Sequence, residues 1–325
     1  MDSDLKTLEG FFRSWRLRPN PTKTVSCAFH LTAREAKKEL KINFCGKAVR
    51  HDPHPKYLGI TLDRSLTSQE HLKKVSGKIR NRVNIIHELT GTGWGCGAQN
   101  LRTSTLALVH STAEYCSPVW SRSAHTHMID TQLHAAMRIV SGTIKSSPLP
   151  WLPVLANIAP PNIRRDQATI REYEKALRNE TTLLHGIMKR PPRARLKSRK
   201  PFWVVGEALY SAGTSMDDRW RDLWKTSPAV NKTLVMDPTL TPPGFDLPRR
   251  YWCAINRIRT LQGRCAALLH KWGLKDSPLC QCGEVQTIDH IVNECPLLFY
   301  QEGIRGIHRA TPDAVNWIAK LDITL

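Results

Sequence analysis

The sequence has no apolar run approaching the roughly 18 residues of a membrane-spanning helix. Its first ten residues, MDSDLKTLEG, are acidic and lack the basic segment that opens a signal peptide. These two absences exclude a predicted membrane protein and favour an intracellular chain, nuclear or cytoplasmic, with no membrane partner.

The sequence also lacks a cysteine pattern typical of a disulfide-bonded protein. The nine cysteines are odd in number and scattered, apart from Cys280 and Cys282. In a reducing compartment this distribution predicts no disulfide framework. No G-x-S-x-G, Walker or Cys/His protease arrangement appears either, which removes the commonest hydrolase and NTPase signatures.

Aromatic residues are few, and acidic residues are heavily outnumbered. Only 7% of the chain is aromatic and 41% is hydrophobic, which favours two or three modest folded units. The 48 Lys and Arg residues against 28 Asp and Glu give a net charge of +20. Such a chain attracts phosphate backbones with a strong dependence on salt, although an anionic membrane surface would compete as a partner.

The hydrophobic pattern predicts a mainly α fold with a small β portion, α+β. A short amphipathic helix is expected over 3–15, and β-like runs at 24–29, 41–49 and 57–62. A basic amphipathic helix follows over 70–89, and further helices are expected up to Pro118, up to Gly142 and over 165–184. The apolar positions behind these helices are Leu72, Val75, Ile79, Val83, Ile86, Leu106, Val109, Ala113, Cys116, Ile129, Leu133, Ala136 and Val140.

Composition also suggests where the chain divides. Residues 189–201 hold seven basic residues and three prolines, and four further prolines lie between Pro238 and Pro248. The predicted units are 1–66, a helical unit over 67–188, a basic Pro-rich linker region over 189–249, a small cysteine-bearing domain over 250–300 and a tail over 301–325.

Four potential metal ligands lie within sixteen residues of that small domain: Cys280, Cys282, His290 and Cys295. Three thiolates and one imidazole meet the requirements of a closed tetrahedral structural zinc site. The alternative is that the cysteines are buried thiols in a core. Cys253 and Cys265 could in principle displace a ligand, and we interpret both as ordinary core cysteines on helices.

Several segments resemble the C-terminal part of reverse transcriptases from non-LTR, jockey-like LINE retrotransposons. The resemblance is carried by LLHKWGL, SPLCQCGEVQT and DHIVNECP within 261–296, by PKYLGITLDRSLTSQEHL at 55–72, by WGCGAQNLR at 94–102, by ALVHSTAEYCSPVW at 107–120, by IAPPNIRRDQA at 158–168, and by Trp15, Asn20, Lys23 and Phe29. It implies the edge of a polymerase palm and its primer grip, a helical thumb and a C-terminal zinc knuckle.

The family is an RNA-directed DNA polymerase that holds Mg²⁺ on palm aspartates, one of them in a Y-x-D-D turn. By that resemblance these motifs should precede Trp15, so we expect a truncated, nucleic-acid-binding homologue that lacks the magnesium ligands and does not polymerise, with no catalytic residue assigned. The pair Asp217 and Asp218 is instead interpreted as a helix N-terminus after Ser215. Lys23 matches the lysine that closes the palm.

The expected partners are RNA or DNA, including a ribonucleoprotein with retrotransposon RNA. Phosphate-contacting residues are predicted on the helix over 70–89, in the 189–200 stretch and in the zinc domain, where Arg257 and Arg259 are further surface candidates. The predicted contacts are Lys23, Lys73, Lys74, Lys78, Arg80, Arg82, Lys189, Arg190, Arg193, Arg195, Lys197, Arg199, Lys200, Arg264 and Lys271. The alternatives are a solvated charged face for the helix and a nuclear localisation signal for 189–200.

Two further functional hypotheses stay open at this point. In one, the chain is the C-terminal half of an active RNA-directed DNA polymerase that its gene model truncates. In the other, it is an interaction protein that uses its zinc domain to contact another protein.

Overall fold

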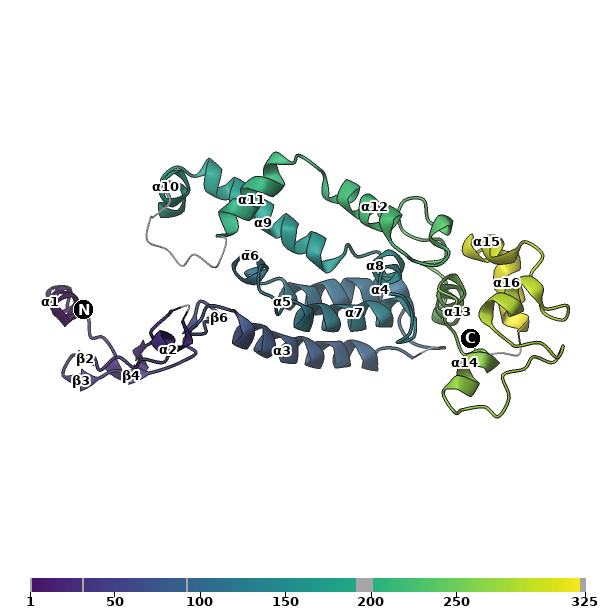
Figure 1. Cartoon of the computed structure of the whole chain (residues 1–325), viewed down its shortest axis with the longest axis horizontal. Coiled ribbons are helices and arrows are strands. Elements are labelled where there is room, and N and C mark those ends of the chain that lie inside the picture. The colour runs from purple at the N-terminus through teal and green to yellow at the C-terminus, as the bar shows by residue number, and fades with distance from the viewer. Residues whose placement is uncertain (1, 31, 92, 191–200, 322–325) are drawn as a thin grey trace.

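The computed structural model describes residues 2–30, 32–91, 93–190 and 201–321. The described chain is elongated and mostly helical, with short strands near the N-terminus, and the two termini lie at opposite ends (Figure 1). The mainly α fold with a small β portion is therefore confirmed. None of the described helices combines the length and apolar character needed to cross a bilayer.

The N-terminal part holds one amphipathic helix and short paired strands. Two of the sheets are hairpins, whose turns contain Cys45 and Gly46 in one case and Leu58 and Gly59 in the other, all at positive φ. This is the backbone twist that two-residue hairpin turns require, which explains the glycines. The elements are α1 (Asp2–Ser14), α2 (Ala33–Ala36), β1 (Val25–Ser26) parallel to β4 (Arg50–His51), β2 (Asn43–Phe44) with β3 (Lys47–Ala48), and β5 (Lys56–Tyr57) with β6 (Ile60–Thr61).

The central part, which we call the helical body, is built around two long helices that pack side by side. These are α3 (Gln69–Glu88) and α7 (His127–Ser141). The chain between them forms α4 (Ala98–Ser104), a π-helical turn (Thr105–His110), α5 (Ser111–Ala113) and α6 (Ser117–Trp120). After α7 come α8 (Trp151–Ala156) and α9 (Pro161–Arg178).

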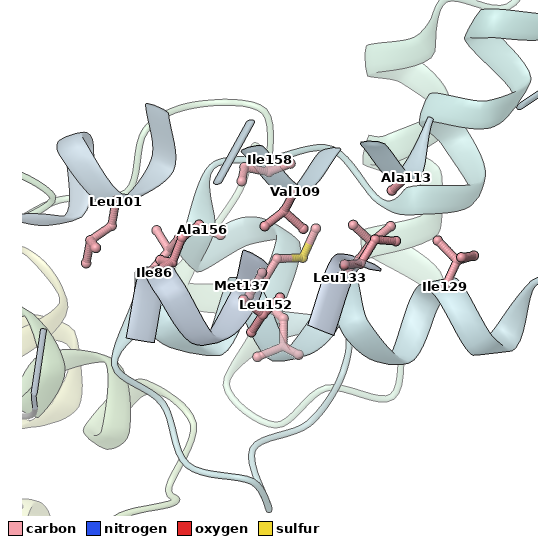
Figure 2. Packing of buried hydrophobic residues seen from close by; sticks show 14 of the residues in the cluster. Ile86, Leu101, Val109, Ala113, Ile129, Leu133, Met137, Leu152, Ala156 and Ile158 are labelled. Carbon is pink, nitrogen blue, oxygen red and sulfur yellow. The ribbon is translucent and has the colours of Figure 1, made fainter. Parts of the chain in front are cut away.

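All five apolar positions predicted on α3 are buried, and so are the four predicted on α7. Figure 2 shows Ile86, Val109, Leu133, Met137 and Leu152 meeting in this core. Each fully buried side chain of this size contributes about 1.5–3 kcal/mol of transfer free energy. α7 ends at Gly142, whose φ is 69°, as the sequence predicted.

The region interpreted as a linker contains two helices, α11 (Phe202–Ser211) and α12 (Met216–Thr226), followed by mostly irregular chain over 227–248. α10 (Leu183–Lys189) follows α9, and both α11 and α12 pack against α9. Trp151 and Trp224 lie edge to face with ring centroids 4.9 Å apart, joining α8 to α12. Residues 191–200, the densest basic part of the predicted linker, lie outside the described residues.

The C-terminal part, residues 249–321, forms a second cluster that we call the C-terminal module. Its elements are α13 (Arg249–Arg259), α14 (Ala266–Lys271), a π-helical turn (His290–Glu294), α15 (Gly303–His308) and α16 (Pro312–Lys320). Ile307, Ala314 and Ile318 share a core with Ile255 and Ile291. The segment interpreted as a tail therefore contributes two helices to this core.

α13 connects the C-terminal module to the helical body through polar side chains. Arg249 donates to the carbonyl oxygens of Val140 (2.9 Å) and Ile139, and Trp252 Nε1 also donates to Val140 (3.0 Å). Two further contacts complete the set, from Asn256 Nδ2 to the Ser141 oxygen (2.8 Å) and from Arg257 Nε to the Gly142 oxygen (3.0 Å). These are the last carbonyls of α7, which lack intrahelical donors and carry partial negative charge.

Candidate metal centre and basic surface

The four predicted ligands come together in the C-terminal module. Their sulfur and nitrogen atoms all lie within 4.8 Å of one another. Cys280 Sγ is 3.8 Å from Cys295 Sγ, and Cys282 Sγ is 3.2 Å from His290 Nε2. Cys280, His290 and Cys295 are buried, and Cys282 is half-buried.

Local backbone geometry explains how so short a sequence assembles four ligands. Gly283, at a φ of 96°, closes a tight turn in which the Cys280 N–H donates to the Glu284 oxygen at 2.7 Å. This turn places both thiols of the C-x-C pair on one loop. The π-helical turn at His290–Glu294 brings Cys295 back beside His290, with the Cys295 N–H donating to the His290 oxygen at 2.7 Å.

Two residues that the sequence analysis missed surround the ligands. Gln286 is buried; its Nε2 lies 3.6 Å from Cys280 Sγ, while its Oε1 accepts from the Ala266 N–H at 2.9 Å. Glu294 Oε2 lies 3.6 Å from His290 Nδ1, on the opposite side of the ring from the cysteines. Such outer contacts orient metal-binding side chains. The one feature of the sequence that could have indicated Gln286 is its position among the cysteines of the cluster.

The thiols differ in electrostatic environment. Burial raises the pKa of Cys280, but hydrogen bonds from the Cys282 backbone, Gln286 and His290 outweigh it and bring the pKa down to about 6. Burial raises the pKa of Cys295. A group of donors that favours one thiolate suits a cation, because metals bind the deprotonated form of cysteine.

The donor set fits zinc. With metal–sulfur bonds of about 2.3 Å, a tetrahedral site separates two sulfurs by about 3.8 Å, which matches Cys280 and Cys295. The cluster can therefore hold a metal such as zinc. Cys253 on α13 and Cys265 at the start of α14 are both buried, and neither belongs to the cluster.

The second candidate site is the solvent-facing side of α3. Lys73, Lys74, Lys78 and Arg80 are exposed, and the helix has no acidic residue between Glu70 and Glu88. No ion pair is recorded for these four side chains within the described ranges. Burial lowers the pKa of the neighbouring His71, and the charges of Lys78 and Lys74 lower it further.

The remaining predicted contacts fall into several groups. Lys23, Lys189, Arg190, Arg264 and Lys271 are exposed. Arg82 is half-buried and donates to the Leu108 oxygen at 2.6 Å, so it has a structural partner. Five predicted residues, Arg193, Arg195, Lys197, Arg199 and Lys200, lie outside the described part of the chain.

Arg257 and Arg259 are not surface residues, which corrects the sequence interpretation. Both are buried, and Arg259 bonds to Asn256 Oδ1 and to the main-chain oxygens of Pro243 and His308. Burial lowers the pKa of Arg259 to about 9. The sequence offered no way to separate these arginines from Arg264, because all three follow one another on a basic, amphipathic stretch.

Asp217 and Asp218 lie at the first turn of α12, as predicted. Ser215 Oγ accepts from the Asp218 N–H at 3.1 Å and donates to Asp218 Oδ2 at 2.6 Å, and Arg221 pairs with Asp218 at 2.8 Å. This is a capping arrangement that satisfies the helix N-terminus. The hydrogen bond from Ser215 and the pairing with Arg221 lower the pKa of Asp218.

The fold and these two sites define a basic helical protein with a Cys₃His cluster at one end. Its homologues are Pol polyproteins of non-LTR retrotransposons. The chain is 23% identical over 266 residues to a Pol polyprotein from the type-1 retrotransposable element R1 4 of Nasonia vitripennis, covering 80% of this chain and 64% of that relative.

Two other relatives agree. A Pol polyprotein from the type-1 retrotransposable element R1 of Bradysia coprophila is 22% identical over 265 residues, 79% of this chain and 25% of the relative. A probable RNA-directed DNA polymerase from transposon BS of Drosophila melanogaster is 30% identical over 116 residues, 36% of this chain and 12% of the relative. The chain thus spans only part of each relative. No family model and no solved structure matches it.

Proposed function

We propose that this chain is a nucleic-acid-binding part of a non-LTR retrotransposon Pol protein, with zinc as a structural ion and without polymerase activity of its own. The exposed face of α3 contacts the phosphates of RNA or DNA without reading bases. The observation that carries the proposal is this set of four exposed cationic side chains, with no acidic residue between Glu70 and Glu88 on the helix.

The geometry of α3 suits a backbone contact. Lys73 and Arg80 are seven residues apart, about 10 Å along the helix axis, so their charges can reach successive phosphates of one strand. Because the helix is held by its buried side against α7, the main chain that carries the cationic side chains is fixed in the fold. Binding by charge alone predicts little sequence preference and a steep dependence on salt.

The dependence of the binding constant on salt concentration tests this role of α3. Replacing Lys73, Lys74 and Lys78 by Gln should weaken binding to a duplex and reduce the slope of log K against log salt by about 2–3. The matched control replaces Lys175, Lys225 and Lys320, which are exposed on other helices, by Gln. Equal slopes for the two triple variants would contradict the proposal.

For the metal, we propose that Cys280, Cys282, His290 and Cys295 hold zinc and that the ion fixes the loop between α14 and α15. When bound, zinc supplies a crosslink between four points of the chain and no chemistry. The Gly283 turn and the π-helical turn bring the four ligands to one point of the fold.

The second candidate function is a part in RNA-directed DNA synthesis, favoured by the similarity to the probable RNA-directed DNA polymerase of Drosophila melanogaster. It predicts incorporation of dTTP on a poly(rA) template with an oligo(dT) primer and Mg²⁺. Incorporation by the purified chain, abolished by a change in α3, would support it. Binding of the same template and primer without incorporation supports the first proposal.

A further inference from the structure

An exposed tryptophan lies in the loop between α3 and α4. Trp94 is 65% exposed, whereas Trp120, Trp151 and Trp252 are at most 2% exposed. Single apolar side chains are common on protein surfaces, so exposure alone assigns no function to this ring. The way in which the loop holds the ring, and the charges around it, are more informative.

The loop fixes the position of Trp94. The buried Thr90 donates its hydroxyl to the Trp94 oxygen at 3.0 Å, and the Gly91 N–H donates to the same oxygen at 3.0 Å. The indole lies over Gly91, where an added Cβ would be 2.9 Å from Trp94 Cδ1 and closer still to Nε1. Part of the ring therefore packs on bare main chain, and the rest faces solvent. A ring held in this way loses little further freedom when a ligand binds.

The residues beside Trp94 add no apolar surface to it. Gly91, Gly93 and Gly95 carry no side chain, and a Cβ at Gly93 would meet nothing within 4 Å. A protein partner usually covers about 800 Å² on each side, with a contiguous apolar centre. An isolated indole among glycines instead suits a single planar ring, which can approach it closely.

Cationic side chains lie on both sides of the loop. Lys78 is exposed on α3, ten residues or about 15 Å before the end of that helix. On the other side, Arg249 Nε donates to the Gly91 oxygen at 3.1 Å, which brings the start of α13 and the exposed Arg250 to the end of α3 (Figure 1). A nucleic-acid strand with its phosphates on these cations can place a base on Trp94.

We propose that Trp94 stacks on an unpaired base of a single-stranded segment of RNA or DNA. The inference rests on the proposed binding of phosphates by α3 and adds to it a preference for unpaired bases. Bases inside a duplex are stacked on one another and cannot cover the indole. Because every base has a flat aromatic face, the contact selects single strands and not a sequence.

The test measures fluorescence anisotropy with the full chain and labelled probes of about 12 nucleotides, a length that single-strand binding sites cover. The probes are oligo(dT), oligo(U), a duplex, and an abasic strand with the same number of phosphates as oligo(dT). The chain should bind oligo(dT) and oligo(U) about ten-fold more tightly than the abasic strand, as expected for one stacked base.

Trp94→Ala should remove this ten-fold preference and leave the affinity for the duplex and the abasic strand unchanged. The dependence of binding on salt should also stay the same, because no charge is lost. Gly91→Ala keeps the indole but displaces it from its seat, so it should weaken binding of oligo(dT) in the same direction. Trp15→Ala is the matched control, because Trp15 is 67% exposed and follows α1 near the other end of the chain.

The outcomes separate this inference from the proposed role of α3. Equal affinity of the original chain for oligo(dT) and the abasic strand, with a steep dependence on salt, overturns the stacking role and leaves phosphate binding by α3 intact. An equal loss of oligo(dT) affinity in Trp15→Ala and Trp94→Ala also overturns it. Failure of the chain to bind any of the four probes overturns both proposals.

Discussion

In the helical body, the core consists of aliphatic side chains, chiefly from α3, α4, α7 and α8, with the rings of Trp120, Phe245 and Trp252, whereas the C-terminal module adds a Cys₃His cluster to a smaller apolar core. The body needs no ion to explain its packing. The module places three buried ligands and Gln286 where a larger domain would place more apolar side chains. Small units that cannot bury enough apolar surface commonly depend on a metal in this way.

The largest expected effect in this comparison is loss of the metal ligands. Cys282→Ser should release zinc and unfold the segment from α14 to α16, because structural zinc contributes about 10 kcal/mol or more of apparent binding free energy. Cys45→Ser, at an exposed cysteine outside the cluster, is the control. Metal content and far-UV circular dichroism check the outcome, and if both stayed unchanged in Cys282→Ser the zinc assignment would be wrong.

The next effect concerns the apolar core of the body. Ile79→Ala should lower the free energy of unfolding by about 2–5 kcal/mol, because Ile79 is fully buried on α3. Ile85→Ala, on the same helix but 55% exposed, should change it by less than about 0.5 kcal/mol. Urea unfolding measures the change in stability, and the zinc content of the folded variant shows whether the C-terminal module is also affected. Zinc release from Ile79→Ala under native conditions would show that the module is not independently held.

The junction between the two regions should respond to a change in α13. Arg249→Met removes the donor to the Ile139 oxygen and one of two donors to each of the Val140 and Gly91 oxygens, at a cost of about 1–3 kcal/mol. Arg250→Met, on the exposed neighbour, is the control. Hydrogen exchange at the end of α7 should rise in the first variant only. Equal exchange in both would mean that the α13 hydrogen bonds do not hold the two regions together.

The smallest expected effect is a dependence of stability on pH, which arises from His308. Burial, and then the charge of Arg259, lower the pKa of His308 to about 4. The unfolded chain therefore binds more protons between about pH 6.5 and 4, so the stabilising contribution is present above pH 6.5 and is lost as the pH falls towards 4.

Replacing His308 by Gln should reduce the loss of stability between pH 7 and pH 5 by about 1 kcal/mol, after allowance for partial exposure of the ring. Urea unfolding at the two pH values measures the difference. A variant with the same pH dependence as the original chain would show that His308 titrates alike in the folded and unfolded states.

The sequence predicted the apolar side of α3 and the end of α7 at Gly142, because both depend on local periodicity and a single glycine. It also identified the four Cys and His residues that the structure brings into one cluster. It predicted the start of α12 after Ser215 but placed no helix at 202–211 or 301–321, because Tyr210 and Ile318 stabilise those segments through contacts distant in sequence. It also assigned Arg257 and Arg259 to the surface, since charge alone does not reveal a carbonyl partner. The domain boundaries and the nucleic-acid contacts stay predictions.

The most direct test of the contrast between the two regions is hydrogen exchange of the purified chain before and after a zinc chelator. The account predicts that chelation raises exchange from α14 through α16, leaves the buried side of α3 protected, and affects α13 least at Trp252, which packs in the body. Unchanged exchange in the module, or equal loss of protection in α3, would contradict it.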